Sequence, residues 1–406
     1  MAGWRTFQRG HASLPAAFLS PVSRTWKRPI AGLGALVSVA LLALLFSSCV
    51  ARDGSTGVAL EPVNLGSAAQ TSTSTANPDQ PSLLDSALAK VQDAAQGLTA
   101  SRSPTGLQTR PLSDDAIQEV QPKLGRAEAR LIDIYRLVSQ GEHRKALAQA
   151  DALVRDHPNF QLAHLVHGDL LSLQVRPVAQ IGDVPDTKAR AALDQLNVLR
   201  EESRRRLRAL TERPPEGSVP TQFLTLSSQS RHAIAVDASR SRLYLFENQT
   251  PAAGNGTLAG APKLKLIGDY YISVGLQGIE KQLEGDKRTP LGVYYITSSL
   301  NPDSLPDLYG VGALPINYPN PLDVQRGKTG SGIWLHGTPR EQFVRAPQAS
   351  DGCVVLSNPD LERLLSTVQI RTTPVVIAPE LHWVRPEVLD TERRQFEATL
   401  QAWRDT

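Results

Sequence analysis

The stretch RHAIAVDASRSRLYLFEN, residues 231–248, decides the fold class of this chain. Two apolar runs flank a turn of small and polar residues, which predicts two β-strands joined by a short connection. Similar runs, rich in Val, Ile and Tyr and bounded by turn-forming residues, recur at 263–275, 291–299, 331–337, 353–357 and 373–379. The sequence therefore predicts a mostly-β domain over residues 230–379.

One helix is predicted to interrupt these strands near the end of the domain. Its sequence, DLERLLSTV, follows Asn358 as the expected N-cap and Pro359 at the first helical position. Leu361, Leu364 and Leu365 are expected to face the core. Residues 380–406 are predicted to form a C-terminal amphipathic helix, to which we assign no chemistry.

Upstream, residues 113–215 follow a helical pattern. Residues 141–173 predict a helix, a turn at Pro158 and a second helix. Ala146, Pro158 and Gly168 sit at spacings that resemble a tetratricopeptide hairpin, although the likeness covers little more than one unit and such units need stacked neighbours. We expect helical hairpins that bind a protein partner, and we expect EESRRRLRAL, residues 201–210, to be a solvated helix face.

Histidines are concentrated in this helical region, at His157, His164 and His167. No cysteine or acidic pattern accompanies them, so packing or surface roles are expected in place of a metal site. The sequence predicts no metal and no organic cofactor.

The N-terminus predicts export. Residues 1–29 form a basic leader, residues 30–51 an apolar segment of nearly membrane-spanning length, and residues 52–112 a flexible linker. The apolar segment fits a retained membrane anchor, a lipoprotein signal that would acylate Cys49, or a cleaved signal peptide. Each interpretation places the remaining chain in the cell envelope, with a periplasmic domain tethered to the membrane in the first two.

Charge argues against a nucleic-acid partner. Five of the 43 Lys and Arg residues precede residue 30, and the 38 that remain are outnumbered by 40 Asp and Glu. The basic pI therefore reflects the leader and not the predicted domains.

Cys353 is the second of only two cysteines, and its role depends on whether it has a disulfide partner. If Cys49 is lipidated, removed or held in the membrane, Cys353 has no partner within the chain. An odd cysteine in an exported protein is either buried and inert or reactive.

A reactive cysteine needs a base, because a free thiol has a pKa of about 8.5. His336 ends the apolar run 331–337, and Cys353 begins the next one after Gly352. Two strand ends can bring such side chains to one rim, and Gly352 leaves room for a substrate. Alternatively, His336 only closes a strand and Gly352 only turns the chain.

Two motifs resemble one known family. His336–Gly337 followed by SDGCVVLSN, residues 350–358, is similar to the L,D-transpeptidase catalytic domain (YkuD-type), whose pattern is a histidine, a gap, Ser/Thr-His-Gly-Cys and then Asn. The segment EGDKRTPLGVYYI, residues 284–296, is similar to the family's Gly-Asp-Lys-x-Thr-Pro-x-Gly-x-Tyr. The likeness covers the predicted β domain and leaves the helical region unexplained.

This resemblance implies a fold and a reaction. The fold class becomes multi-domain α+β, a mostly-β sandwich preceded by a helical hairpin region and a membrane-anchoring segment. Cys353 would attack the carbonyl of the third residue of a peptidoglycan stem tetrapeptide and expel D-alanine, with His336 moving the proton. Backbone N–H groups near Gly352 and Cys353 would hold the oxyanion, and an acceptor amine would complete a 3→3 cross-link.

Two positions depart from the family pattern. Asp351 stands where relatives have His, and Val355 where many have Arg. A carboxylate beside the thiol would raise the thiol's pKa and disfavour an oxyanion. We therefore expect Asp351 to face away or to be neutralised by Arg340 or Arg345; alternatively it is a plain turn residue.

The resemblance also assigns supporting residues. Ser350 either hydrogen-bonds near the histidine or braces the loop, and Gly337 supports the site. Candidate substrate contacts, each with packing or capping as the alternative, are Trp334, Tyr309, Arg345 and Asn358. The segment from Gly285 to Gly292 is expected to shape the sheet.

Three functions remain after this reasoning. The first is an L,D-transpeptidase that joins stem peptides or attaches another acceptor amine. The second is an amidase or carboxypeptidase that uses the same Cys-His pair with water. The third is a scaffold that binds wall peptides without chemistry, favoured by the altered Asp351 and Val355.

Overall fold

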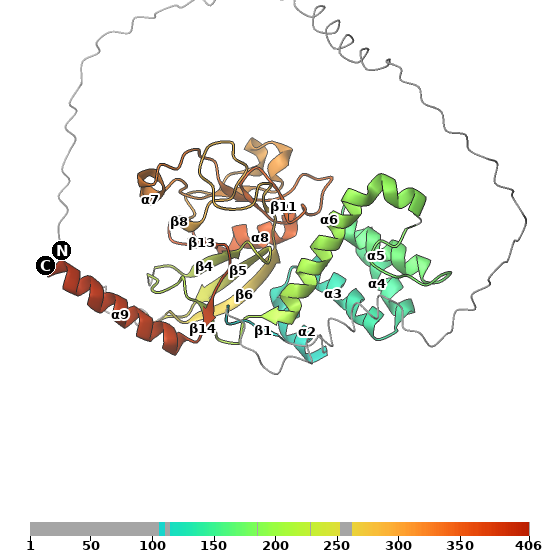
Figure 1. Cartoon of the computed structure of the whole chain (residues 1–406), viewed down its shortest axis with the longest axis horizontal. Helices are drawn as coiled ribbons and strands as arrows, with labels where there is room; N and C mark the ends of the chain where they lie inside the picture. Colours follow the sequence, from blue (N-terminus) through green and yellow to red (C-terminus); the bar gives the residue numbers. More distant parts are fainter. Residues whose placement is uncertain (1–104, 110–113, 185, 228, 252–261, 406) are drawn as a thin grey trace, which may run out of the picture. The chain divides into compact units, whose positions relative to one another are not determined.

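The computed structural model describes residues 105–109, 114–184, 186–227, 229–251 and 262–405 (Figure 1). Every described residue belongs to one unit of the chain, Ala76–Thr406. The leader, the predicted anchor 30–51 and most of the linker 52–112 lie outside the described residues. None of the helices that the structure describes is long and apolar enough to cross a membrane.

The helical region comprises the helices that precede the β domain. Its apolar positions repeat at helical spacing, and α3, α4 and α5 pack in succession around one cluster that contains Leu131, Leu153 and Phe160. The elements are α2 (Asp114–Val120), the 3-10 turn η1 (Gln121–Lys123), α3 (Arg126–Ser139), α4 (His143–Asp156), α5 (Gln161–Ser172) and α6 (Asp186–Thr211). Helical hairpins are therefore present, while membership of the tetratricopeptide family stays a prediction.

Strands and turns alternate after α6, as the sequence predicts. A five-stranded sheet has the order β6-β5-β4-β13-β8, and a three-stranded sheet has the order β12-β10-β9. The first consists of β4 (His232–Asp237), β5 (Arg242–Asn248), β6 (Leu264–Tyr271), β8 (Gly292–Tyr295) and β13 (Pro374–Ala378), and the second of β9 (Ala313–Pro315), β10 (Trp334–His336) and β12 (Val354–Val355).

Short elements complete the described chain. Three pairs of two-residue or three-residue strands join distant segments: β1 with β2, β3 with β14, and β7 with β11. These strands are β1 (Gln108–Thr109), β2 (Glu212–Arg213), β3 (Val219–Pro220), β7 (Val274–Gly275), β11 (Gln348–Ser350) and β14 (Trp383–Val384). The remaining elements are η3 (Pro302–Ser304), η4 (Asp307–Tyr309), α7 (Pro321–Gln325), α8 (Asn358–Thr367) and α9 (Pro386–Arg404).

One apolar core joins the two larger sheets and α8. Ile234 and Val375 enter it from the five-stranded sheet, Leu335 and Val354 from the three-stranded sheet, and Leu361 from α8. All five side chains are essentially inaccessible to solvent. The core therefore fixes β10 and β12, the two strands that carry or adjoin the candidate catalytic residues.

Buried charges join the helical region to the five-stranded sheet. Glu128 of α3 accepts hydrogen bonds from Arg206 of α6 at 2.9 Å and from Arg242 of β5 at 2.8 Å, and Arg242 also bonds Asp269 of β6 at 2.7 Å. Buried charges of this kind persist only when they are paired, because removing one partner leaves an uncompensated ion. Paired buried ions therefore hold the helical region against the five-stranded sheet.

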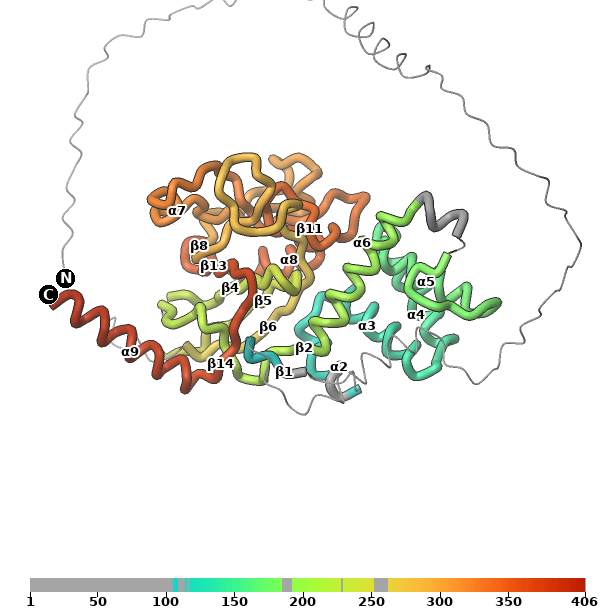
Figure 2. The backbone as a smooth tube through the Cα atoms, viewed as in Figure 1, coloured from blue at the N-terminus to red at the C-terminus, as the bar shows by residue number. Residues whose placement is uncertain are grey.

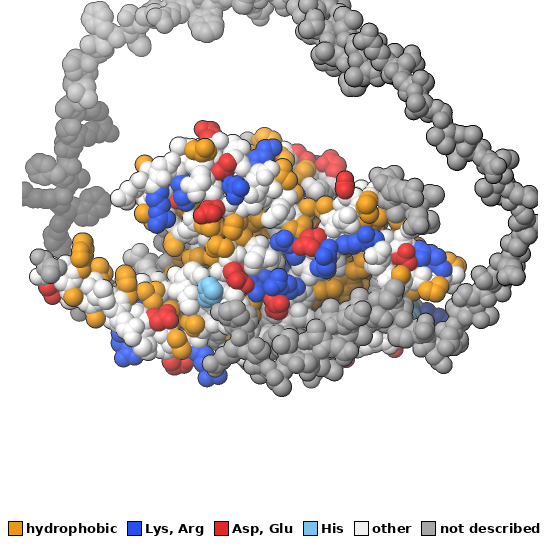
Figure 3. All heavy atoms as spheres, in the orientation of Figure 1, with side chains coloured by type: hydrophobic (Ala, Val, Ile, Leu, Met, Phe, Trp, Pro, Cys, Tyr) orange, Lys and Arg blue, Asp and Glu red, His pale blue; other side chains and the backbone are white. Residues whose placement is uncertain are grey.

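Part of the predicted solvated face on α6 is wrong. Glu202 and Arg206 are each 3% exposed, and the Arg206 guanidinium lies 3.9 Å from the Tyr271 ring centroid. Other charges on the same helix, such as Arg204 and Arg208, do face solvent, where they pair with acids. On the face seen in Figure 3, acidic and basic side chains are interspersed.

Two local predictions also need correction. The N-cap of α8 is Ser357, whose hydroxyl accepts from the Asp360 N–H, and not Asn358. Residues 105–109, placed in the flexible linker by their composition, are packed into the fold: β1 pairs with β2, and Leu107 is 1% exposed. The Trp383 N–H donates to the Thr105 carbonyl, so this segment reaches the end of the β domain.

Candidate active site

His336 and Cys353 come together because β10 and β12 are parallel neighbours. Leu335 is level with Val354, and His336 is level with Val355. Cys353 directly precedes Val354, so it lies level with Trp334, two residues before His336 on the adjacent strand. Adjacent strands are about 4.8 Å apart, and alternate residues share a face. His336 and Cys353 therefore lie on the same face of two adjacent chain segments, as the prediction of two neighbouring strand ends requires.

The Cys353 thiol is protonated at rest. The residue is half-buried, and its Sγ donates to the Gly332 carbonyl oxygen at 3.5 Å. Burial raises the pKa of the thiol, and the Trp334 N–H and the Arg345 charge oppose that rise. A proton must therefore leave before the sulfur can attack a carbonyl.

His336 is arranged to remain a neutral base. Its Nδ1 lies 2.7 Å from the Gly337 carbonyl oxygen, and only a protonated Nδ1 can donate there. The Nε2 lone pair is consequently unprotonated in the neutral ring. Burial lowers the pKa of His336 to about 4, with a further lowering from Arg345, so the imidazole is neutral at physiological pH.

The turn before Cys353 is held by hydrogen bonds at Ser350 and Gly352. Ser350 Oγ donates to the Cys353 carbonyl at 2.6 Å and accepts from the Gly352 N–H at 3.1 Å. The bracing role is thus the one the structure shows for Ser350. Because the Gly352 N–H is occupied, the Cys353 N–H, which has no partner among the described residues, is the better oxyanion donor.

Glycine is required at position 352. Its φ of 123° is one that L side chains rarely adopt, and an added Cβ would lie 2.7 Å from the Arg288 carbonyl oxygen. Thr289 fixes this turn further, since its Oγ1 donates to the Gly352 carbonyl at 2.9 Å and accepts from the Gly275 N–H at 2.8 Å. Thr289 belongs to the upstream motif 284–296, so that motif supports the cysteine turn directly, a role that sequence reasoning missed.

Lys281 is a second residue that sequence reasoning missed. It is 3% exposed, bonds Asp286 Oδ1 at 2.8 Å, and its charge lowers the pKa of Cys353. The Lys281 ion pair and three backbone N–H donors lower the pKa of Asp286 to about 2. The only sequence signal was the Gly-Asp-Lys motif itself, in which Asp286 gathers these groups.

Asp351 is exposed to solvent, and its charge adds to the rise in the pKa of Cys353 that was expected of a carboxylate beside the thiol. Its side chain is 84% exposed and pairs with Lys287 at 3.6 Å. Of the two bases named from sequence, Arg340 is wrong, because it pairs with Asp307 at 3.6 Å. Arg345 interacts with Asp351 only through its longer-range field.

Aromatic rings cover the histidine. The Tyr309 ring lies 4.7 Å from the Trp334 ring and 5.0 Å from the His336 ring, centroid to centroid. The Gly337 N–H donates to the Tyr309 carbonyl at 3.0 Å. Tyr309 and Trp334, predicted as cleft residues, therefore lie beside His336 and are both half-buried.

Arg345 carries a positive charge with no acidic partner. Its guanidinium donates to the Ala349 and Leu308 carbonyls, each at 3.4 Å, and no carboxylate that the structure describes lies within salt-bridge distance of it. Its charge lowers the pKa values of both Cys353 and His336. A guanidinium held in this way suits an anionic ligand near the thiol.

Asn358 is a clamp and not a free substrate contact. Its amide Nδ2 donates to the Thr338 carbonyl at 2.9 Å, and its Oδ1 accepts from the N–H groups of Thr338 and Val311. A Cβ at Gly337 would lie 2.0 Å from this oxygen, which explains that glycine. Both ends of the amide are therefore used to hold the chain after His336.

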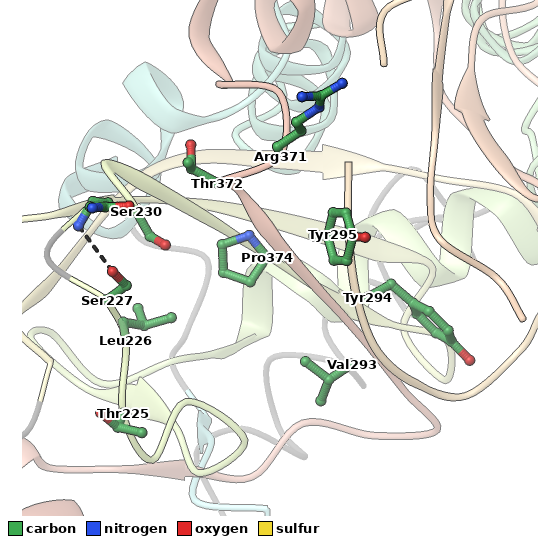
Figure 4. Close-up of a pocket in the computed structure, with 11 residues that line it drawn as sticks. Thr225, Leu226, Ser227, Ser230, Val293, Tyr294, Tyr295, Arg371, Thr372 and Pro374 are labelled. Atoms are coloured by element: carbon green, nitrogen blue, oxygen red, sulfur yellow. Dashed lines mark hydrogen bonds between the residues drawn. The ribbon is translucent and has the colours of Figure 1, made fainter. Parts of the chain in front are cut away.

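Two cavities border the described part of this domain, and Cys353 is not among the lining residues of either. One, of about 380 Å³, lies along β8 and β13 and is lined by residues that include Tyr295, Arg371 and Pro374 (Figure 4). Another, of about 560 Å³, is lined by residues that include Asp307, Arg340 and Asn358, next to the clamp. In the described ranges, no three His, Cys, Asp or Glu side chains gather in a way that could hold a metal ion.

The histidines of the helical region have separate surroundings. His157 lies 4.9 Å from the Phe343 ring, and His164 Nε2 is 2.9 Å from the Pro158 carbonyl oxygen. His167 reaches Asp151 only at 4.0 Å.

Comparison with known proteins gives one family match over the region that contains this site. Residues 231–377 match the family model described as the L,D-transpeptidase catalytic domain, YkuD. Comparison with curated proteins finds no match.

Similar solved structures include Bd1075 of Bdellovibrio bacteriovorus, at 30% identity and a TM-score of 0.37 over 46% of this chain and 63% of that one. The helical cell shape determining protein Pgp2 of Campylobacter jejuni is 26% identical, with a TM-score of 0.34 over 44% and 59%. An L,D-transpeptidase of Mycobacterium smegmatis is 13% identical, with a TM-score of 0.21 over 36% and 58%. The matched region thus spans less than two thirds of each of these proteins.

Proposed function

We propose, on the premise that residues 231–377 belong to the YkuD family of L,D-transpeptidase catalytic domains, that this protein acts on peptidoglycan stem tetrapeptides by cysteine acyl transfer. The observation that carries the proposal is the tautomer of His336. Its Nδ1 is committed to the Gly337 carbonyl, so Nε2 is the basic nitrogen, on the strand beside Cys353.

The first half-reaction follows from these protonation states. His336 Nε2 takes the thiol proton as Cys353 Sγ bonds to the carbonyl carbon of stem residue three. The developing oxyanion accepts a hydrogen bond from the Cys353 N–H. The C–N bond to the terminal D-alanine then breaks, and the His336 proton passes to the departing amine. The product is a thioester on Cys353.

An acceptor amine or water completes the cycle. Attack by the side-chain amine of a second stem re-forms an amide and gives a 3→3 cross-link, and its proton leaves through His336. Attack by water gives a trimmed tripeptide, which is the carboxypeptidase outcome. Both outcomes return Cys353 to the thiol, and the proposal favours transfer because the family is named for it.

Arg345 supplies recognition in this proposal. In a stem tetrapeptide, one carbon separates the scissile amide nitrogen from the carboxylate of the terminal D-alanine. A guanidinium beside the thiol with no acidic partner can bind that carboxylate as the amide reaches the sulfur. This arrangement selects a terminal D-alanine over an extended or amidated peptide.

The proposed setting is the cell envelope. Residues 30–51 would anchor the chain in the membrane or end in acylated Cys49, and residues 52–112 would let the catalytic domain reach the wall. The helical region could also hold a protein partner there.

The experiment that tests the function uses purified cell-wall fragments. The protein and its Cys353→Ala variant are each incubated with disaccharide-tetrapeptide, with and without added acceptor, and the products are analysed by mass spectrometry. We expect D-alanine release and dimeric products from the unsubstituted protein, and neither from the Cys353→Ala variant. Trimmed monomers without dimers would assign the carboxypeptidase reaction, and identical profiles from both proteins would overturn the proposal.

A further inference from the structure

The chain between β10 and β11 leads from His336 toward the turn that precedes Cys353, and it touches the helical region. This segment, residues 337–347, is called the linking loop here, and it lies on the side of the β domain toward the helices (Figure 2). We propose that the helical region is a working part of the active site: Phe343 anchors the linking loop in the helical core and so positions Arg345 beside Cys353. The substrate in this proposal is taken from the proposed function, whereas the contacts are those of the structure and do not depend on that function.

The anchoring contact is apolar and well buried. Phe343 is 8% exposed and belongs to the core cluster of the helical region, although it comes from the β domain in sequence. Its ring stacks on Phe160 at 4.4 Å between centroids and lies 4.9 Å from His157. A buried aromatic side chain of this kind contributes strongly to the packing of two regions.

Backbone hydrogen bonds hold the same part of the loop. The Phe343 N–H donates to the Asn159 carbonyl at 3.2 Å, and the Asn159 side-chain amide donates to the Arg340 carbonyl at 2.8 Å. Asn159 and Phe160 lie between α4 and α5, so the turn of the predicted hairpin is the surface that receives the loop. The loop is thus bound through a ring and two backbone groups.

Arg345 follows this anchor by two residues and is fixed from the sheet side. The Tyr271 hydroxyl donates to the Arg345 carbonyl at 3.1 Å, and the Val274 N–H donates to the Pro347 carbonyl at 3.0 Å. The Arg345 side chain itself has only two long hydrogen bonds to carbonyl oxygens. Its position therefore depends on the backbone, which is held by the helices on one side and by β6 and β7 on the other.

Phe343 is accordingly a positioning residue that acts through Arg345. If its ring is removed, the backbone on the helix side of Arg345 is no longer fixed. The positive charge near Cys353 becomes mobile, and binding of the substrate carboxylate weakens. Binding of the stem peptide beside Cys353 therefore depends on a contact made in the helical region.

The experiment compares Phe343→Ala, the conservative Phe343→Leu, Arg345→Ala and the double variant Phe343→Ala/Arg345→Ala. Two measurements are made: kcat/KM on disaccharide-tetrapeptide, and the pH profile of Cys353 alkylation by iodoacetamide. Leu131→Ala serves as control, since Leu131 is fully buried in the same helical cluster but lies on α3. Thermal melting of each variant records any loss of stability.

For Phe343→Ala we expect about a tenfold loss in kcat/KM, carried mainly by KM, and an alkylation profile shifted to higher pH. Phe343→Leu should recover most of both, and the double variant should be no worse than Arg345→Ala. Leu131→Ala should lower the melting temperature without shifting the profile.

An additive double variant, or a Phe343→Ala profile that matches Leu131→Ala, would overturn the positioning role. The alkylation profile needs no substrate. A shifted profile in a protein that turns over no wall peptide would therefore leave the positioning role standing and remove the proposed function.

Discussion

The two charged side chains near the Cys353 thiol differ in how they are neutralised. Asp351 projects into solvent and pairs with Lys287, so water and a cation screen its charge. Arg345 is half-buried, and no carboxylate that the structure describes pairs with it. A departure from a family motif therefore matters less than where its charge lies: Asp351 is exposed and paired, so its charge only adds to the rise in the pKa of Cys353, whereas Arg345 is available to a substrate.

The largest effect is expected at the base shared by both halves of the reaction. His336→Ala removes the neutral imidazole on the strand beside the thiol, and loss of a general base costs about 10²–10⁴-fold in rate. Single-turnover measurement of D-alanine release would check this. His232→Ala, a matched change at the start of β4, should leave the rate within about twofold. Equal losses in the two variants would show that the histidine acts through folding.

Arg345→Ala should follow in size. A hydrogen-bonded charge on a carboxylate contributes about 1.5–3 kcal/mol, so kcat/KM for the tetrapeptide should fall by about 10- to 100-fold. The loss should be small for a tetrapeptide whose terminal carboxylate is amidated, because that substrate lacks the partner. Arg345→Lys should recover part of it. The same loss on both substrates would remove the carboxylate contact.

The pH profile of kcat/KM is expected to be broad. Both His336 and Cys353 must be neutral before attack, so activity falls as pH drops through about 4, the lowered pKa of His336, and falls again above the raised pKa of the thiol. Arg345→Ala should move the acid limb toward higher pH, because the Arg345 charge lowers the histidine pKa. An acid limb near 6.5, the ordinary value for histidine, would contradict the buried neutral ring.

The smallest effect is expected at Asp351. Asp351→Asn removes a solvent-exposed charge that already pairs with Lys287, so kcat/KM should change by about twofold or less. The alkylation profile should shift slightly to lower pH, because the Asp351 charge raises the pKa of Cys353. Kinetic assays at low and high salt would check the change in kcat/KM. A loss as large as that of Arg345→Ala would mean that the Asp351 charge matters to the reaction as much as the Arg345 charge does.

Sequence reasoning predicted what local pattern determines. The alternation of apolar runs and turn residues fixed where β4, β5, β10 and β12 lie, since side-chain periodicity and turn chemistry are local. The motif at residues 350–358 likewise identified Cys353 as the candidate nucleophile. The cap of α8 was displaced by one residue because Ser and Asn are both good N-caps and the pattern does not distinguish them.

Tertiary contacts account for what could not be predicted. Arg206 looks like a surface charge in EESRRRLRAL, but it is buried against Glu128, an acid 78 positions away that no local pattern pairs with it. Phe343 reads as part of a loop in the β domain, yet it completes the helical core. The predicted partner of Asp351 was wrong for the same reason. A tertiary hydrogen bond between Thr289 and Gly352 holds the segment that carries Lys287 beside the turn that carries Asp351.

The central claim is that Cys353 forms a thioester with stem residue three. The direct measurement is intact-protein and peptide mass spectrometry after brief mixing with disaccharide-tetrapeptide and acid quench. We expect an adduct equal to the substrate minus D-alanine, located on the peptide that contains Cys353 and absent in Cys353→Ala. Turnover of substrate without an adduct there, or an adduct at another residue, would contradict it.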